Sequence, residues 1–153
     1  MKIAISIAVC LLIGYAGGFA TASSISTWYV TLEKPIFNPP NWIFGPVWTV
    51  LYILMGISFG MIWKMNPSPE RNLAMIVFAI QLVLNFAWSF LFFYFKHLLG
   101  AFIEIVVLWL GIAFCIMLFY KLKPAAAYLL IPYILWVSFA SLLNFSIYWL
   151  NKS

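Results

Sequence analysis

Long apolar stretches follow one another along the chain, and most of the charged residues lie in the connections between them. Each stretch is close to the ~20 residues that an α-helix needs to cross the ~30 Å hydrocarbon core of a bilayer. The apolar residues run continuously instead of alternating, which argues against the strands of a membrane β-barrel. The pattern therefore predicts an all-α membrane protein, a bundle of five transmembrane helices over approximately residues 3–22, 44–63, 72–95, 98–120 and 125–149.

The connections between the predicted helices differ in length. The short ones are residues 64–71, 96–97 and 121–124. Short connections place consecutive helices antiparallel, in an up-and-down bundle. The first connection, residues 23–43, is longer and combines three prolines with several aromatic residues. Because proline restricts the backbone and long loops of compact proteins are often lids or binding loops, we predict a lid over a single domain of residues 1–153.

The first apolar stretch has two interpretations. A basic start followed by apolar residues and an A-x-A site at residues 20–22 also matches a cleavable signal peptide, whose removal would leave four helices. Gly14 and Gly18 favour a helix that stays in the membrane, because small residues four apart let transmembrane helices pack closely. The same spacing recurs in the second predicted helix, at Gly56 and Gly60.

Composition agrees with a lipid environment. The 153 residues are 67% hydrophobic and 20% aromatic, and only 7% are charged, against about 25% in soluble domains. A soluble chain of this length could not hide so much apolar surface from water. The net charge of +5 comes from cations at the ends of apolar stretches. That distribution indicates contact with lipid headgroups, and it lacks the basic cluster that nucleic-acid binding requires.

The cations also predict an orientation. In an up-and-down bundle they divide five to three between the two ends: Lys2, Lys64, Arg71, Lys121 and Lys123 on the side of the N-terminus, and Lys34, Lys96 and Lys152 on the other. The positive-inside tendency then places the N-terminus in the cytoplasm and the 23–43 loop outside.

Aromatic and polar residues share faces on three of the predicted helices. The faces are Phe44, Trp48 and Tyr52 on the second helix; Gln81, Asn85, Trp88 and Phe92 on the third; and Tyr133, Trp136, Ala140 and Asn144, beside Ser141, on the fifth. Amides at membrane depth should point into the bundle. The faces predict a mostly apolar internal cavity, typical of a small-molecule site. The alternative is that the rings serve packing or the membrane interface, and that the amides hold helices together.

The sequence offers little for classical catalysis or metal binding. His97 is the single histidine and lies in a predicted turn, while Cys10 and Cys115 lie apart within apolar stretches. No nucleophile–base pair, carboxylate pair or metal-ligand cluster is visible, and no span offers a histidine to haem. We therefore predict no metal site and no required cofactor. Glu104 is the one acidic residue inside a predicted span and, although such carboxylates are candidate functional groups, we assign it no role.

The first loop and second helix carry a motif that resembles the signature of the TspO/MBR family, the tryptophan-rich sensory proteins also called translocator proteins or peripheral benzodiazepine receptors. The motif comprises Trp28-Tyr29, Leu32-Glu33-Lys34-Pro35, Asn38-Pro39-Pro40, Trp42, Phe44-Gly45-Pro46-Val47-Trp48-Thr49 and Leu51-Tyr52. Segments 85–88 and 132–144 are similar to the family as well, so the resemblance covers essentially the whole chain in order. It implies a five-helix bundle that keeps its first span, and the compact loops resemble those of bacterial members.

The resemblance also implies a pocket under the first loop, commonly in a homodimer. Family members bind porphyrins, including protoporphyrin IX, and benzodiazepine or isoquinoline-carboxamide compounds. Carried over to this sequence, the ligand-binding residues are Trp28, Tyr29, Phe44, Trp48, Tyr52, Asn85, Trp88, Trp136 and Ala140. Some bacterial members are reported to degrade protoporphyrin in light, which makes Trp48 and Trp136 candidate catalytic residues.

Three functions therefore stay open: a receptor or sensor for tetrapyrroles, a light-dependent porphyrin-degrading enzyme, and a transporter of such compounds. Transporters often have broken helices and repeats, and here only Pro132 suggests a break. Expected partners are the bilayer and an aromatic ligand. A cholesterol pattern at Leu143, Tyr148 and Lys152 is discounted, because such patterns are weak and a bacterial membrane would offer no cholesterol.

Overall fold

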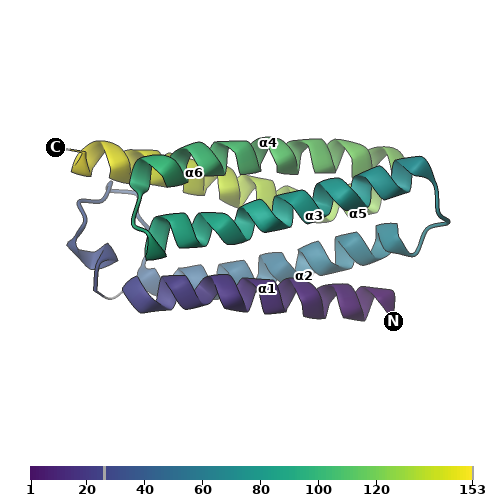
Figure 1. The fold of residues 1–153 in the computed structure, drawn as a ribbon, viewed down its shortest axis with the longest axis horizontal. Helices are drawn as coiled ribbons and strands as arrows, with labels where there is room; N and C mark the ends of the chain where they lie inside the picture. Colours follow the sequence, from purple (N-terminus) through teal and green to yellow (C-terminus); the bar gives the residue numbers. More distant parts are fainter. Residues whose placement is uncertain (26, 153) are drawn as a thin grey trace.

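The computed structural model describes residues 1–25 and 27–152, with the backbone alone for residues 20 and 22–24. Five helices of membrane-spanning length lie along the long axis of the molecule, and the two termini lie at opposite ends (Figure 1). In chain order the elements are α1 (Lys2–Ser24), the 3₁₀ turns η1 (Tyr29–Thr31) and η2 (Asn41–Ile43), α2 (Phe44–Trp63), α3 (Pro69–Ser89), the π-helical η3 (Phe90–Tyr94), α4 (Leu98–Leu122), α5 (Pro124–Leu129) and α6 (Ile131–Asn151). The predicted all-α, five-span fold is confirmed.

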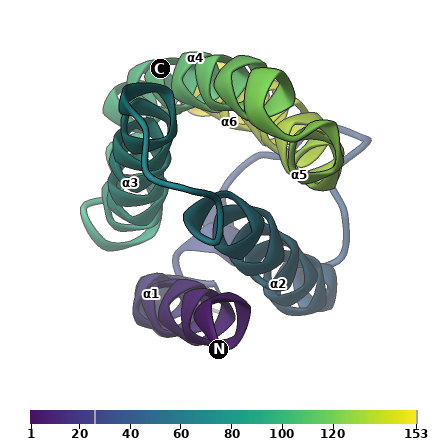
Figure 2. The same ribbon diagram turned by 90° about the vertical axis from the view of Figure 1, so that its right-hand side faces the viewer.

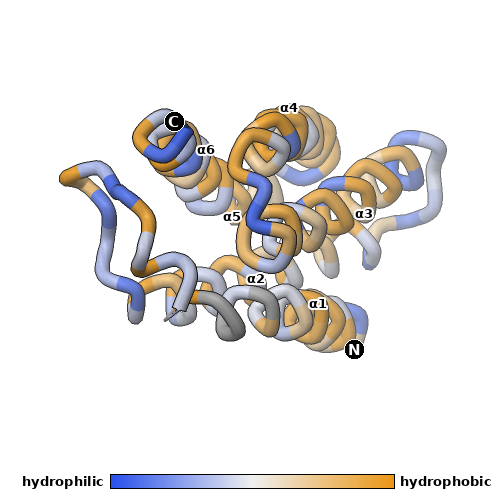
Figure 3. Tube along the Cα trace, turned by 60° about the vertical axis from the view of Figure 1, so that its left-hand side comes forward, coloured by the Kyte–Doolittle hydropathy of each residue, from blue (hydrophilic) through white to orange (hydrophobic). Residues whose placement is uncertain are grey.

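The outer faces of the helices suit a hydrocarbon solvent. Figure 3 shows apolar residues running along all the helices, with the most polar stretches at their ends and connections. Large apolar side chains such as Leu12 and Leu110 point outward and are 70% and 58% exposed. Because such faces are stable only in lipid, the chain is a multi-pass integral membrane protein.

Two helix starts are fixed by side-chain caps. The Ser68 hydroxyl accepts the backbone N–H of Arg71 at the start of α3. At the start of α4, His97 Nδ1 accepts the N–H of Gly100 at 2.8 Å. Each cap satisfies a backbone donor that the first helical turn leaves free. His97, which is predicted to lie in a turn, therefore also caps the N-terminus of α4.

The fifth predicted helix differs from expectation because it is broken. The apolar pattern predicts one helix over residues 125–149, but α5 ends at Leu129 and α6 begins at Ile131. Pro132 has no N–H for the preceding turn, and its ring crowds that turn's carbonyl. Across the break, the N–H of Leu130 bonds to Ala127 O instead.

The bundle is solid at one end and hollow at the other. Viewed from the end that carries the N-terminus, α1 and α2 lie together on one side, facing an arc formed by α3, α4, α6 and α5 (Figure 2). Near that end the ring of Phe78 packs against Phe59 and Phe119, at centroid distances of 4.8 and 6.0 Å. These rings fill the space between α2, α3 and α4. The hollow therefore lies at the opposite end, beneath the long first connection.

Candidate ligand-binding site

A cavity of about 850 Å³ lies inside the end of the bundle that the first connection covers. Its walls come from α1, α2, the α3–η3 segment and α6, and residues of the first connection close the top. We call residues 27–43 the lid. The volume is within the range of about 300–1,000 Å³ that small-molecule sites occupy.

Most of the predicted ligand-binding residues surround this cavity. The lining includes Tyr29, Phe44, Trp48, Tyr52, Trp88, Trp136 and Ala140. The other two predicted residues, Trp28 and Asn85, are not part of the lining. Trp28 packs edge-on against Phe92, at 5.7 Å between ring centroids, and Asn85 is buried below the cavity. The structure thus brings seven of the nine together, and ligand binding by them stays a prediction.

Trp48 and Trp136 form a corner of the cavity. Their rings are perpendicular, at 90°, with centroids 6.5 Å apart. Phe44 packs edge-on against Trp136 at 6.2 Å, and Tyr52 lies tilted against Trp48 at 5.7 Å. Edge-to-face and offset contacts of this kind are the favourable arrangements of aromatic rings. The two indoles are therefore held in position by their neighbours, without any ligand.

A chain of hydrogen bonds runs below the cavity through three helices. The Tyr52 hydroxyl donates to Asn85 Oδ1 at 2.6 Å, and Asn85 Nδ2 donates to the Tyr133 hydroxyl at 2.8 Å. Tyr133 in turn donates to Gln81 Oε1 at 2.6 Å. All four side chains are buried. The amides predicted to point into the bundle do so, and they hold α2, α3 and α6 together.

A second set of bonds fixes Trp88. Its indole N–H donates to Asn144 Oδ1 at 3.0 Å, and Asn144 Nδ2 donates to the carbonyl of Leu98 at 3.0 Å. These bonds join α3, α4 and α6 at the side of the cavity. Because the Trp88 N–H is already used, this residue offers a ligand its ring and not its donor.

Tyr29 anchors the lid from inside. Its ring packs against Phe44, Phe92 and Phe93, at centroid distances of 5.8 to 6.1 Å. Its hydroxyl donates to Asn38 Oδ1 at 2.7 Å within the lid itself. Burial raises the pKa of Tyr29 to about 12, because the tyrosinate anion would lose its hydration. The hydroxyl therefore remains a donor at neutral pH.

A latch ties the lid to the end of α6. The N–H of Glu33 donates to Asn151 Oδ1 at 3.0 Å, and Asn151 Nδ2 donates to the carbonyl of Glu33 at 2.8 Å. Phe37 adds an edge contact with Phe139, at 6.0 Å between centroids. The predicted lid thus lies directly over the cavity and is held at two places.

Two buried polar groups near these walls have no hydrogen-bond partner among the described residues. One is the indole N–H of Trp136, which belongs to the cavity lining, and the other is the Gln81 amide nitrogen below it. An unpaired buried donor is costly, and the Trp136 nitrogen is covered by protein atoms, so the part of Trp136 that lines the cavity is its ring carbons. Glu104 also has both carboxyl oxygens buried without a hydrogen bond to any described residue, and it is absent from the lining.

Sequence reasoning missed the contribution of α1. Gly14, Tyr15, Gly18 and Phe19 all line the cavity. The Gly14–Gly18 spacing predicts close helix packing at both glycines, but only Gly14 packs closely, against the ring of Tyr52. A β-carbon built on Gly18 would meet nothing within 4 Å. The spacing alone cannot distinguish a glycine that packs against a neighbouring helix, such as Gly14, from a glycine that borders a cavity, such as Gly18.

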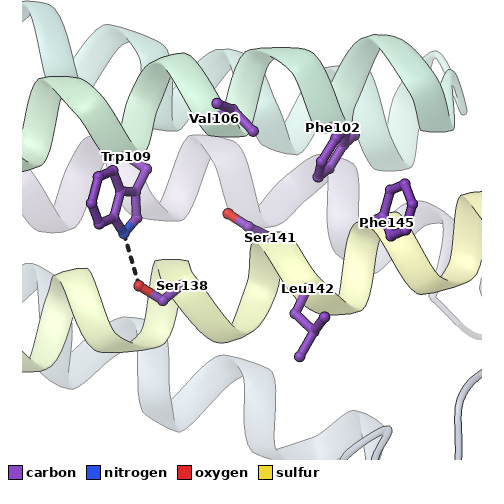
Figure 4. A pocket seen from close by; sticks show the side chains of 7 residues that line it. All are labelled: Phe102, Val106, Trp109, Ser138, Ser141, Leu142 and Phe145. Carbon is purple, nitrogen blue, oxygen red and sulfur yellow. Dashed lines mark hydrogen bonds between the residues drawn. The ribbon is translucent and has the colours of Figure 1, made fainter.

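A shallower groove of about 410 Å³ lies on the outer face of α4 and α6 (Figure 4). The Trp109 indole N–H donates to Ser138 Oγ at 2.8 Å, and the hydroxyls of Ser138 and Ser141 donate to backbone carbonyls of α6. Its polar side chains are thus already paired, so the groove offers a neighbouring molecule apolar contact only. The cavity under the lid is the better candidate for a specific site.

Comparison with known proteins gives consistent matches over most of the chain. The sequence profile described as "TspO/MBR family" matches residues 6–150. A protein named "Tryptophan-rich protein TspO" from Chlorobaculum tepidum is 43% identical, over 99% of this chain and 96% of its own length. One of the same name from Archaeoglobus fulgidus is 44% identical, over 99% and 97%. A "Translocator protein" from Bos taurus is 36% identical, over 91% of this chain and 83% of its own length.

Proposed function

Since the chain belongs to the TspO/MBR family, we propose that its cavity binds flat conjugated ligands, porphyrins such as protoporphyrin IX first and benzodiazepine or isoquinoline-carboxamide compounds second. A membrane receptor or sensor role follows from the family, one of whose members is named "Tryptophan-rich sensory protein". The class of ligand is what we propose beyond this role.

The observation that carries the proposal is the corner of Trp48 and Trp136. The two indole rings are perpendicular, at 90°, and both residues line the same cavity. A planar macrocycle can stack on one ring and contact the other edge-on, and each such contact adds about 0.5–1.5 kcal/mol beyond the buried area. A metal-free porphyrin needs no axial ligand from the protein.

Tryptophan quenching tests the proposal directly. Protoporphyrin IX is titrated in the dark into detergent-solubilised wild type, Trp48→Leu and Trp136→Leu. Leucine keeps apolar bulk and removes the ring, so each variant should bind about two- to twelvefold more weakly, the equivalent of one aromatic contact. Trp109→Leu is the matched control, because Trp109 lies in the outer groove away from the cavity. Non-saturable quenching in the wild type, or equal weakening by Trp109→Leu, would reject the proposal.

A second candidate function is light-driven breakdown of the bound porphyrin, and the contact between Trp48 and Trp136 favours it. An excited porphyrin can take an electron from an adjacent indole, which leaves the pigment reduced and the indole oxidised. Illumination of the complex, followed by absorbance, separates this activity from simple binding. Bleaching no faster than in empty detergent micelles would leave the protein a binder only.

A further inference from the structure

Helices α1 and α2 touch closely in the half of the molecule away from the lid. A β-carbon on Gly60 would lie 2.6 Å from Cα of Ile3, and one on Gly56 would overlap the backbone of Ile7. The glycines therefore let the two backbones meet without intervening side chains. Figure 1 shows these helices running antiparallel, side by side, toward the lid.

The same antiparallel register, continued toward the lid, pairs Gly18 of α1 with Gly45 of α2. Here the contact is lost: a β-carbon built on either glycine would meet nothing within 4 Å. Both glycines line the cavity, and both are exposed. Two helices that touch at one end thus leave a gap at the other, with a glycine on each side. We call this gap the α1/α2 slot.

The slot connects the cavity with the outer face of the bundle. Tyr15 and Phe19 line the cavity next to Gly18, yet their side chains are 84% and 78% exposed. Thr49, on the α2 side, also lines the cavity and is exposed. Because these residues both line the cavity and are exposed on the outer surface of the bundle, the cavity is open at this position. Gly18 lies at the lid end of the first membrane span, so this opening faces the bilayer.

The neighbouring walls are closed by contacts. Between α2 and α6, Phe44 and Trp48 both pack against Trp136. Between α1 and α3, a β-carbon on Gly17 would lie 3.4 Å from Ser89 Oγ, which is ordinary packing distance. The lid is held by Tyr29 and by the Asn151 latch. Passage through these walls requires contacts to break, whereas the slot has no side chain at either glycine.

We propose that the α1/α2 slot is a side entrance, through which a flat apolar ligand moves edge-on between the bilayer and the cavity. The proposal rests on the function proposed above and adds the route. An apolar aromatic molecule concentrates in the hydrocarbon phase, so an opening toward lipid meets a higher ligand concentration than one toward water. A slot bounded by glycines admits the thin edge of a planar molecule and obstructs a bulky one.

The test compares association and dissociation rates of protoporphyrin IX by stopped-flow tryptophan quenching in lipid nanodiscs. Gly18→Leu places a side chain in the slot and should slow both association and dissociation, each about fivefold or more. Gly17→Ala is the matched control, because it changes a helix glycine on the α3 side of α1 and should keep wild-type rates. Asn151→Ala loosens the lid and should also leave both rates unchanged.

Several results would overturn the side entrance. Wild-type rates in Gly18→Leu would do so, as would faster exchange in Asn151→Ala, which would assign the route to the lid. A rise in the dissociation rate alone would place Gly18 under the bound ligand instead. If Gly18→Leu does not fold, Gly45→Leu on the opposite side of the slot carries the test, and unchanged rates in it reject the proposal. Failure of the wild type to bind would reject the proposed function itself, which is a distinguishable result.

Discussion

Tyr52 on α2 and Asn85 on α3 are joined by a 2.6 Å hydrogen bond, in which the tyrosine hydroxyl donates to the amide oxygen. Through this bond, a residue of the cavity wall is connected to the buried chain of polar side chains. The ring of Tyr52 lines the cavity beside Trp48, and its hydroxyl begins the chain that continues to Tyr133 and Gln81. The position of the pocket aromatics thus depends on polar groups that lie beneath it.

Replacement of Asn85 by leucine should destabilise the fold. The change leaves the hydroxyls of Tyr52 and Tyr133 each without one bond in a buried site. We expect the free energy of unfolding to fall by about 1–3 kcal/mol, measured by circular dichroism in detergent. Asn66→Ala, in the exposed 64–71 connection, is the control and should have no effect. Equal stability of Asn85→Leu and wild type would show that the chain contributes nothing.

Alanine at two glycines should have opposite effects. Gly56→Ala puts a methyl group against the backbone of Ile7, so overpacking should lower stability by about 1–3 kcal/mol. Gly18→Ala places the same group in open space and should be neutral or stabilise α1 by up to ~1 kcal/mol through helix propensity. Thermal unfolding of both variants measures the difference. Similar losses in the two would contradict the divergence of α1 and α2.

Loss of the latch should loosen the lid locally. In Asn151→Ala the backbone N–H of Glu33 loses its acceptor, so its hydrogen exchange should accelerate about two- to tenfold, the equivalent of one hydrogen bond. Asn151→Asp keeps an oxygen for this N–H and should retain most of the protection. Hydrogen-exchange mass spectrometry of a peptide that contains Glu33 provides the measurement. Unchanged exchange in Asn151→Ala would mean that the lid is held elsewhere.

The lid should lose stability in alkali through Tyr29. Its pKa is raised by burial to about 12 in the folded protein, from about 10 in an unfolded chain. The contribution of the neutral hydroxyl is therefore complete below about pH 10 and is lost as the pH rises through 12. The difference in tyrosinate absorbance between wild type and Tyr29→Phe should titrate near pH 12. A midpoint near 10 would indicate an exposed side chain.

Some features of the site follow from local spacing. Phe44, Trp48 and Tyr52 share one face of α2 because they are four residues apart, and all three line the cavity. Gln81 and Asn85 point inward because an unpaired amide is costly in hydrocarbon. The break in the fifth helix follows from Pro132, which has no N–H for the preceding turn.

The sequence by itself determined that the chain crosses the membrane five times and that three aromatic faces point inward, because continuous apolar length and 3.6-residue periodicity are local properties. The tertiary structure decided what those faces enclose. It placed Asn85 beneath the cavity instead of in its lining, and it left Gly18 beside open space. The open space at Gly18 depends on the separation of α1 and α2 toward the lid, and the position of Asn85 depends on its bonds to Tyr52 and Tyr133. These bonds, like the contacts of Ile3 with Gly60 and Ile7 with Gly56, join residues that are distant in sequence, so the local pattern cannot specify them.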